Sequence, residues 1–354
     1  MYRQSEETIT MEKVRDRTLD IAKAICIILM VVGHSGCPTY LYNFLYLFHM
    51  PCFFFISGWL LSDKYLDDLK TGLLKKAQGS YVPFVKWTLI FLLFHNVFAS
   101  MHIYADSYSW QTFIERVVRA FTMTGGESLL GGFWFLISLF WASVGAVLFL
   151  HFLHKNQILT FINIWGGVIL LLIITTFWHY LPISLPQMFG EQTLLATIFY
   201  LSGYACHKQI IEPKHPAIYG ATLLVIPAIV AIFLHIGMTE AEGWLVPLYY
   251  FIAMVGTIGI LWLSKSLVTD KVATRILGYI GDKTLYILIF HFLAFKLVSF
   301  IYIHCTKMPI ELLEQSPVSV RNNWIWVVYS LTGIGLSLLA WELIHSMPLK
   351  LRKK

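Results

Sequence analysis

Three ionisable side chains share one apolar stretch near the start of the chain, and their types could support proton transfer and anion binding. Asp20, Lys23 and His34 are the ionisable groups, apart from the thiol of Cys26, in DIAKAICIILMVVGH. At about 100° per residue, the eleven steps from Lys23 to His34 return to within about 20° of the starting direction. A neutral imidazole accepts protons near pH 7, and an ammonium group binds anions. The spacing predicts a base and a cation on one helix face, about 16 Å apart.

Further histidines fall inside apolar stretches at a comparable depth. His49, His95 and His291 can each be placed in the outer half of a spanning segment measured from its own start. Ionisable groups inside a membrane usually mark function or are paired, so these three and His34 indicate a shared polar cavity. A core histidine bonded to a carbonyl explains each of the three equally well when taken singly. Lys23 could also snorkel to the interface beside Asp20, and His34 could cap a helix end.

The composition excludes a soluble domain. Of 354 residues, 57% are hydrophobic and 13% are charged, and the mean hydropathy is +0.68, whereas soluble proteins carry about a quarter charged residues. The net charge of +6 is spread over short loops without a basic patch, which excludes a nucleic-acid partner. The five cysteines show no CxxC spacing, and the histidines show no metal-ligand spacing, so no metal is expected. The polar N-terminus lacks a signal-peptide pattern, so the first span is expected to be retained.

The apolar stretches predict an all-α, polytopic membrane protein of about ten transmembrane helices. Eighteen Lys and Arg residues fall on the side of the N-terminus and four on the other, which places both termini in the cytoplasm. We expect a cytoplasmic segment at 1–18, a transmembrane domain at 19–345 and a basic tail at 346–354. An amphipathic helix at 108–121 is expected in the outer interface. The predicted spans are 19–36, 41–62, 81–101, 131–152, 160–180, 190–206, 217–237, 244–264, 276–303 and 323–345.

Several residues within these spans predict local geometry. Pro51 should kink the second span and open carbonyls near His49, while Ser57-Gly58 offers a small surface for close helix packing. Gly278 and Gly281 should loosen the start of the ninth span, where Lys283 beside Asp282 is expected to form an interfacial ion pair. Tyr286 and His291 should point inward from that helix.

Four motifs together resemble the membrane acyltransferase 3 family, and the likeness covers nearly the whole chain. Asp20-x2-Lys23-x10-His34 is similar to the family's basic-x10-His signature, with Lys where many relatives carry Arg. The other motifs are FHMPCFFFISGWLL at 48–61, FWFLISLF at 133–140 and GYIGDKTLYILIFH at 278–291. The chain looks closest to the stand-alone sugar O-acetyltransferase branch.

The resemblance implies acyl transfer from cytoplasmic acetyl-CoA, as donor, to a hydroxyl of a cell-envelope or exported glycan or a lipid-linked sugar, in the cytoplasmic (inner) membrane. His34 is expected to act as the base or to carry the acyl group, and the residues leave these two routes open. Lys23 is expected to contact the donor, with Asp20 orienting it. We expect Lys23, Arg17 and Lys76 to bind acetyl-CoA, and His49, His291, Tyr286, Ser57 and Trp134 to bind or orient the acceptor.

Other functional classes stay open from the sequence. A transporter or flippase for a lipid-linked glycan or small solute could use the same intramembrane Lys and His, although the paired broken helices typical of inverted-repeat transporters are missing. A non-catalytic membrane sensor is a further alternative. The lipid bilayer is the expected environment, and the sequence leaves the acyl group, the acceptor and a homo-oligomeric state open.

Overall fold

The computed structural model describes residues 17–181, 187–207, 209, 213–321 and 324–346, and these residues form helices and connecting loops without a strand. Most of the expected cytoplasmic segments at 1–18 and 346–354 lie outside the described residues. The first helices are α1 (Thr18–His34), α2 (Thr39–Tyr46), α3 (His49–Trp59), α4 (Lys64–Asp67), α5 (Leu69–Lys76), the π-helix η1 (Ala77–Tyr81), α6 (Val82–Leu93), α7 (His95–Ser100) and α8 (Trp110–Phe121). They are followed by η2 (Ser128–Phe133), α9 (Trp134–Lys155), α10 (Phe161–Trp178), η3 (Gln187–Phe189), α11 (Glu191–Cys206), α12 (Pro216–Phe233), α13 (Leu245–Leu267), α14 (Lys271–Asp282), α15 (Thr284–Thr306), η4 (Ile310–Glu314) and α16 (Ile325–Ser346).

Seven helical stretches in the described residues are long and apolar enough to cross a membrane, with α2 and α3 counted as one and η2 and α9 as another. The other three predicted spans coincide with shorter helices. The first is α1, with 17 residues, and the sixth is α11, with 16 residues. The third is divided between α6 and α7 at Phe94. A multi-pass membrane protein is therefore supported, while ten crossings and the cytoplasmic side of both termini stay predictions.

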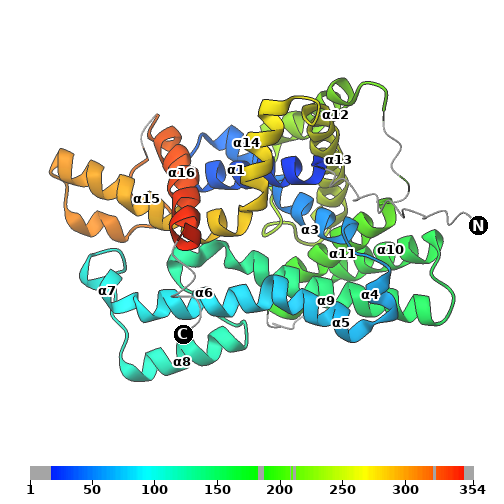
Figure 1. The fold of residues 1–354 in the computed structure, drawn as a ribbon, viewed down its shortest axis with the longest axis horizontal. Coiled ribbons are helices and arrows are strands. Elements are labelled where there is room, and N and C mark those ends of the chain that lie inside the picture. The colour runs from blue at the N-terminus through cyan, green and yellow to red at the C-terminus, as the bar shows by residue number, and fades with distance from the viewer. Residues whose placement is uncertain (1–16, 182–186, 208, 210–212, 322–323, 347–354) are drawn as a thin grey trace, which may run out of the picture.

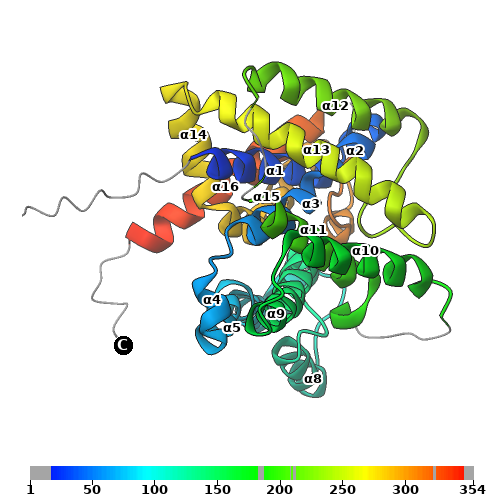
Figure 2. The same cartoon turned by 90° about the vertical axis from the view of Figure 1, so that its right-hand side faces the viewer.

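The helices form two groups joined by α3 and α11. In Figure 1, α1, α14, α15 and α16 lie in the upper half and α6, α8 and α9 in the lower half, with α3 and α11 between them. The contacts agree, because α3 packs on α1 and α11, and α11 packs on α9. Figure 2 shows α12 and α13 side by side along one edge, next to α1. The first helix thus lies against several elements that are distant in the sequence.

Two close backbone contacts require glycine. A Cβ on Gly58 would lie 1.8 Å from the Tyr200 carbonyl oxygen, and one on Gly203 would lie 1.9 Å from that of Phe55, so α3 and α11 meet at their backbones. This confirms the predicted close packing at Gly58. A Cβ on Gly281 would lie 2.0 Å from the carbonyl oxygen of Asp20. Gly281 thus brings α14 against α1, and the predicted span breaks one residue later, after Asp282.

The break in the second predicted span precedes Pro51. The chain leaves α2 after Tyr46 and starts α3 at His49, and Phe48 between them has non-helical angles. Pro51 is therefore the third residue of α3, where the first turn needs no backbone donor. The kink expected at Pro51 is thus a break between two helices three residues earlier, at Phe48. The carbonyl of Leu45 accepts hydrogen bonds from the Phe48 amide at 3.3 Å and from His49 Nδ1 at 2.7 Å.

The ninth predicted span, 276–303, is likewise two helices. α14 ends at Asp282 and α15 begins at Thr284, so Lys283 lies at the junction. The expected ion pair between Lys283 and Asp282 is not formed among the described residues. Instead, Asp282 pairs with Arg17 at 3.3 Å, and the Lys283 ammonium lies over the rings of Tyr279 and Trp341, 3.7 and 4.3 Å from their centroids. Cation–π contacts replace the missing carboxylate for this lysine.

The amphipathic segment forms α8, which packs beside α6 at the lower edge of Figure 1. Trp110, Ile114 and Val118 are exposed and follow one another at four-residue spacing, so they share a helix face. Glu115 and Arg119 form an ion pair at 2.5 Å on another part of the surface. An exposed apolar stripe beside a charged face fits the predicted interfacial position, which the structure by itself leaves as a prediction.

Candidate active site

The last residue of α1 is paired with a histidine from the far end of the chain. Nδ1 of His34 lies 3.1 Å from Nε2 of His291, and the two rings stack with centroids 5.3 Å apart and planes 13° apart. Nδ1 of His291 lies 2.9 Å from the carbonyl oxygen of Ile287, one turn earlier in α15. Two histidines separated by 257 positions thus form a hydrogen-bonded chain ending on a backbone carbonyl.

The hydrogen bonds from His34 to His291 and from His291 to the Ile287 carbonyl determine which ring nitrogens carry hydrogens when both histidines are neutral. A carbonyl oxygen only accepts, so Nδ1 of His291 carries a hydrogen and its Nε2 holds a lone pair. Nδ1 of His34 must then donate to that lone pair, which leaves Nε2 of His34 as the basic nitrogen. The geometry therefore gives His34 the tautomer that a general base requires, with its other nitrogen held in place.

His34 lines a cavity of about 210 Å³ together with His49 and Trp134. His49 donates through Nδ1 to the Leu45 carbonyl, so its Nε2 is also free of a hydrogen in the neutral form. Three predicted site residues are therefore brought to one place, with His291 directly behind His34. The remaining lining residues are Met30, Tyr42, Tyr46, Met50, Gly132, Met238, Thr239 and Leu288.

The two cavity tyrosines were missed from the sequence. Tyr42 and Tyr46 stack with centroids 3.9 Å apart, and the Tyr46 ring lies edge-on to His49 at 4.9 Å. Their four-residue spacing places them on one face of α2, and that periodicity next to His49 was the available signal. Apolar aromatic bodies with hydroxyl groups suit a site that holds a polar molecule within a membrane.

Lys23 lines a second cavity, of about 190 Å³, farther toward the start of α1. Ser57, predicted to bind the acceptor, lies here rather than beside His34, and its hydroxyl donates to the Phe53 carbonyl at 2.8 Å. Met30, Met50 and Leu288 line both cavities. From this shared lining we infer that these three apolar side chains form a constriction between the cavity with the lysine and the cavity with the histidines.

A network of ion pairs lies at the start of α1. The Asp20 carboxylate is 3% exposed and pairs with Lys23 Nζ at 2.9 Å and with Arg17 at 3.2 Å. Arg17 also reaches Asp282 of α14. This confirms that Asp20 contacts Lys23, as the spacing predicted. Arg17, Asp20, Lys23 and His34 therefore follow α1 from a charged end to a neutral end.

The family comparison agrees with this arrangement. The profile described as "Acyltransferase domain", of the acyltransferase 3 family, matches residues 16–342. The chain belongs to the acyltransferase 3 family. Neither the curated proteins nor the solved structures contain a significant match. The matched region includes every histidine and cation of the two cavities, so the geometry above is that of a membrane acyltransferase domain.

Two predicted site residues of the acyltransferase lie away from both cavities. Tyr286 of α15 lies beside Trp87 and His345, with ring centroids 6.1 and 5.4 Å away. Lys76, at the end of α5, lies over the Tyr200 ring at 5.3 Å, and burial lowers the pKa of its amine to about 8. The structure does not bring either residue to His34 or Lys23, and their functional roles stay predictions.

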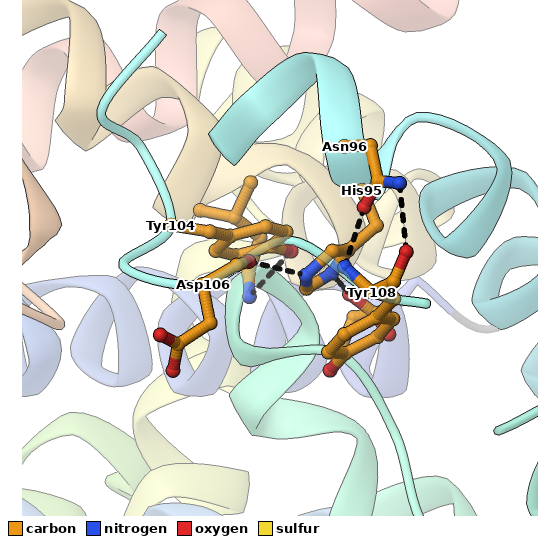
Figure 3. A network of polar contacts seen from close by, with 7 residues as sticks. His95, Asn96, Tyr104, Asp106 and Tyr108 are labelled. Carbon is orange, nitrogen blue, oxygen red and sulfur yellow. Dashed lines mark hydrogen bonds and ion pairs between the residues drawn. The ribbon is translucent and has the colours of Figure 1, made fainter. Parts of the chain in front are cut away.

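His95 of the acyltransferase belongs to a separate network, so the prediction of one cavity shared by all four histidines was wrong. Its Nδ1 lies 2.6 Å from Glu127, and its Nε2 lies 2.9 Å from the Asp106 carbonyl. Figure 3 shows the ring between Tyr104 and Tyr108. Because the carbonyl only accepts, Nε2 carries a hydrogen, and a further proton lies between Nδ1 and the carboxylate. The side chains of His95 and Glu127 are both buried.

This network holds the segment that leads into the histidine cavity. Glu127 directly precedes η2, and the Leu129 amide donates to the Tyr104 hydroxyl at 3.4 Å. A Cβ on Gly132 would lie 2.8 Å from Leu288 and 4.0 Å from the His291 ring, so the backbone of η2 lies against α15. His95 is therefore placed to support the wall of the cavity from outside it.

Among the described residues, one group has ligand atoms close enough together to hold a metal ion, and this group lies outside the lining of both cavities. His179, Glu191 and Glu242 have ligand atoms within 4.8 Å of one another. Nδ1 of His179 lies 3.3 Å from a Glu242 carboxylate oxygen and 3.9 Å from one of Glu191. None of the three lines the cavity with His34. An ion-pair cluster around His179 accounts for this arrangement.

Proposed function

We propose that this protein is an integral-membrane O-acyltransferase that moves an acetyl group from cytoplasmic acetyl-CoA to a hydroxyl of a cell-envelope or exported glycan or a lipid-linked sugar. The observation that supports it best is the line of two cavities along one face of α1. Lys23 lines the first cavity and His34 lines the second, with His291 holding His34. A donor entering from one side and an acceptor from the other would meet at the constriction between them.

The chemistry requires a base near the meeting point. Nε2 of His34 accepts the proton of the acceptor hydroxyl while the hydroxyl oxygen forms a bond to the thioester carbonyl carbon. The tetrahedral intermediate then breaks its carbon–sulfur bond. The CoA thiolate leaves with the electron pair and takes the proton from His34, which regenerates the neutral imidazole and yields an O-ester and a free thiol.

His291 supports the charged state of this cycle. When His34 gains a proton, its Nδ1–H becomes a stronger donor to Nε2 of His291. His291 in turn donates to the Ile287 carbonyl, so the positive charge is shared along a hydrogen-bonded chain without a buried carboxylate. The alternative in which His34 itself carries the acyl group uses the same nitrogen and the same partner.

The two ends of the path fit the two substrates. Acetyl-CoA is anionic, and the ion-pair network at Arg17, Asp20 and Lys23 offers it two cations at the start of α1. Trp134 and the stacked tyrosines line the histidine cavity, and aromatic faces with hydroxyl groups suit a sugar. The positive-inside bias of the sequence supports a cytoplasmic position for the cationic end.

The test is transfer of radiolabelled acetyl from acetyl-CoA into envelope glycans by membranes carrying the wild type, His34→Ala or Lys23→Ala. We expect His34→Ala to lower the rate by about 10²–10⁴-fold. Lys23→Ala should label poorly at low donor concentration and recover partly as the donor is raised. His304→Ala is the matched control, since His304 is exposed near the end of the helix that carries His291.

Each outcome is judged on protein that elutes from size exclusion as the wild type does. Labelling by His34→Ala at the wild-type rate would remove the assigned base. If the wild type with its native envelope transfers no acetyl but moves an unmodified solute, the protein is a transporter, and the cavities are its pathway.

A further inference from the structure

A basic cleft on α14 adjoins the cationic end of the path. The cleft has a volume of about 440 Å³, within the usual range for small-molecule sites. Among the described residues, four cations and a single carboxylate, Asp282, line it. The cations are Arg17, Lys271, Arg275 and Lys283, and the other lining residues are Val268, Thr274, Gly278 and Tyr279.

The cations of this cleft differ in how they are occupied. Arg17 pairs with Asp20 and Asp282, and Lys283 lies over two aromatic rings. Lys271 and Arg275 are exposed and lie four residues apart on one face of α14. Within the described part of the chain, neither of these two forms an ion pair. They are therefore the cations available to an incoming anion.

The positive charge of the cleft comes from side chains, because the backbone amides at the N-terminus of α14 are not free to bind an anion. The Asp270 carboxylate accepts hydrogen bonds from the amides of Val272 and Ala273 at 2.7 and 3.0 Å, so the N-terminus of α14 is already capped. Gly278 leaves the cleft open near Arg17, because a Cβ there would meet only Arg17 Nη1, at 3.8 Å. The anion must then lie between α14 and the start of α1.

From these observations we infer that the cleft binds the 3′-phosphorylated adenosine diphosphate end of coenzyme A, an inference that rests on the proposed function. Lys271 and Arg275 would contact the phosphates, and Arg17 would join the cleft to the path. Arg17 lines the cleft, Asp20 bridges it to Lys23, and Lys23 lines the first cavity. The bound nucleotide thus directs its pantetheine arm along α1.

The length of the donor fits this path. An extended pantetheine arm has about thirteen bonds between its phosphate and its sulfur, or about 15 Å by the geometry of an extended chain. From the level of Arg17, that distance corresponds to about ten residues of helix, close to Ile27. Ile27 and Met30 line the first cavity, and Met30 also lines the cavity of His34. The thioester would arrive at the constriction, below the side chain of His34.

The test compares donors with and without the nucleotide. The full-length protein carrying Lys271→Ala, Arg275→Ala or both is assayed with acetyl-CoA and with S-acetylpantetheine. We expect the double variant to raise KM for acetyl-CoA at least about tenfold, or about 1.4 kcal/mol, and KM for S-acetylpantetheine less than about twofold. Lys70→Ala and Lys155→Ala are matched controls, because both lysines lie outside the lining of the cleft.

A binding experiment separates this inference from the proposed function. Adenosine 3′,5′-bisphosphate is titrated into His34→Ala protein, which needs no turnover, with and without the α14 substitutions. Loss of affinity in the double variant supports the site. If the wild type transfers acetyl from acetyl-CoA but the double variant keeps its affinity, the site is wrong and the proposed function stands. If the wild type neither binds the nucleotide nor uses acetyl-CoA, both fall.

A third experiment tests whether the cleft binds the phosphate of a lipid head group instead of the phosphates of a nucleotide. Purified protein is mixed with vesicles containing phosphatidylglycerol, and lipid retention is compared between the wild type and the double variant. Retention that depends on Lys271 and Arg275, with nucleotide affinity unchanged, would make the cleft a site for lipid head groups and overturn the inference.

Discussion

The two ends of α1 hold ionisable groups in opposite ways. At its start, Asp20 forms ion pairs with Lys23 at 2.9 Å and Arg17 at 3.2 Å. At its end, His34 is held by a second imidazole, His291, at 3.1 Å. Asp20 is 3% exposed and His291 is fully buried. Burying a charge costs several kcal/mol unless an opposite charge is present, whereas neutral imidazoles need only hydrogen-bond partners.

In the proposed reaction, this difference would let one helix serve two substrates. The cations at the start of α1 would attract the anionic donor. A carboxylate beside His34 would stabilise its protonated form, and among the described residues the lining of its cavity contains none. The neutral end keeps its base unprotonated, while the charged end stays charged. Changing one end should therefore leave the function of the other largely intact.

The largest expected effect comes from removing the carboxylate at the charged end. Asp20→Ala leaves Lys23 and Arg17 without their shared partner, which costs about 3–5 kcal/mol where a buried pair is broken. The unfolding midpoint in detergent should therefore fall clearly, as measured by size exclusion after heating. The double variant Asp20→Asn with Lys23→Met should be more stable than Asp20→Asn alone, since it leaves one cation fewer unpaired. Equal stability of these two proteins would contradict the expected cost of leaving Lys23 unpaired.

The next effect concerns the neutral end. His291→Phe removes the acceptor for His34 Nδ1 and should lower kcat for acetyl transfer by about 10²-fold. KM for acetyl-CoA should change less than about twofold, because the donor contacts lie at the other end of α1. His291→Gln keeps an acceptor oxygen and should recover part of the rate. A rise in donor KM with kcat unchanged would contradict the separation of the two ends.

The sequence predicted the residues of this comparison better than their partners. The face shared by Asp20, Lys23 and His34 follows from helical periodicity alone, and the structure keeps that order along α1. The partner of His34 lies 257 positions away, and no local periodicity specifies such a contact. His95 illustrates the same limit, because depth along a helix does not specify the face, and its partners are Glu127 and Asp106.

The breaks within two predicted spans were another feature that hydropathy could not predict. Apolar stretches continue through Phe48 and Lys283, so the composition predicted single spans where the structure has two helices each. Both breaks position residues of the proposed sites. The first starts α3 at His49, and the second turns α14 so that Lys271 and Arg275 lie beside Arg17.

The smallest effect concerns the constriction between the two ends, which Met50 shares with Met30 and Leu288. If the acyl group crosses at this point, its width should be limited by these side chains. Met50→Ala should raise the ratio of butyryl to acetyl transfer about fivefold, since pocket contacts with a methylene group are worth about 1–3 kcal/mol. Met50→Leu keeps the volume and should keep the wild-type ratio. Met308→Ala, at an exposed position, controls for loss of a methionine. An unchanged ratio in folded Met50→Ala protein would place the crossing of the acyl group elsewhere and leave the two cavities unconnected.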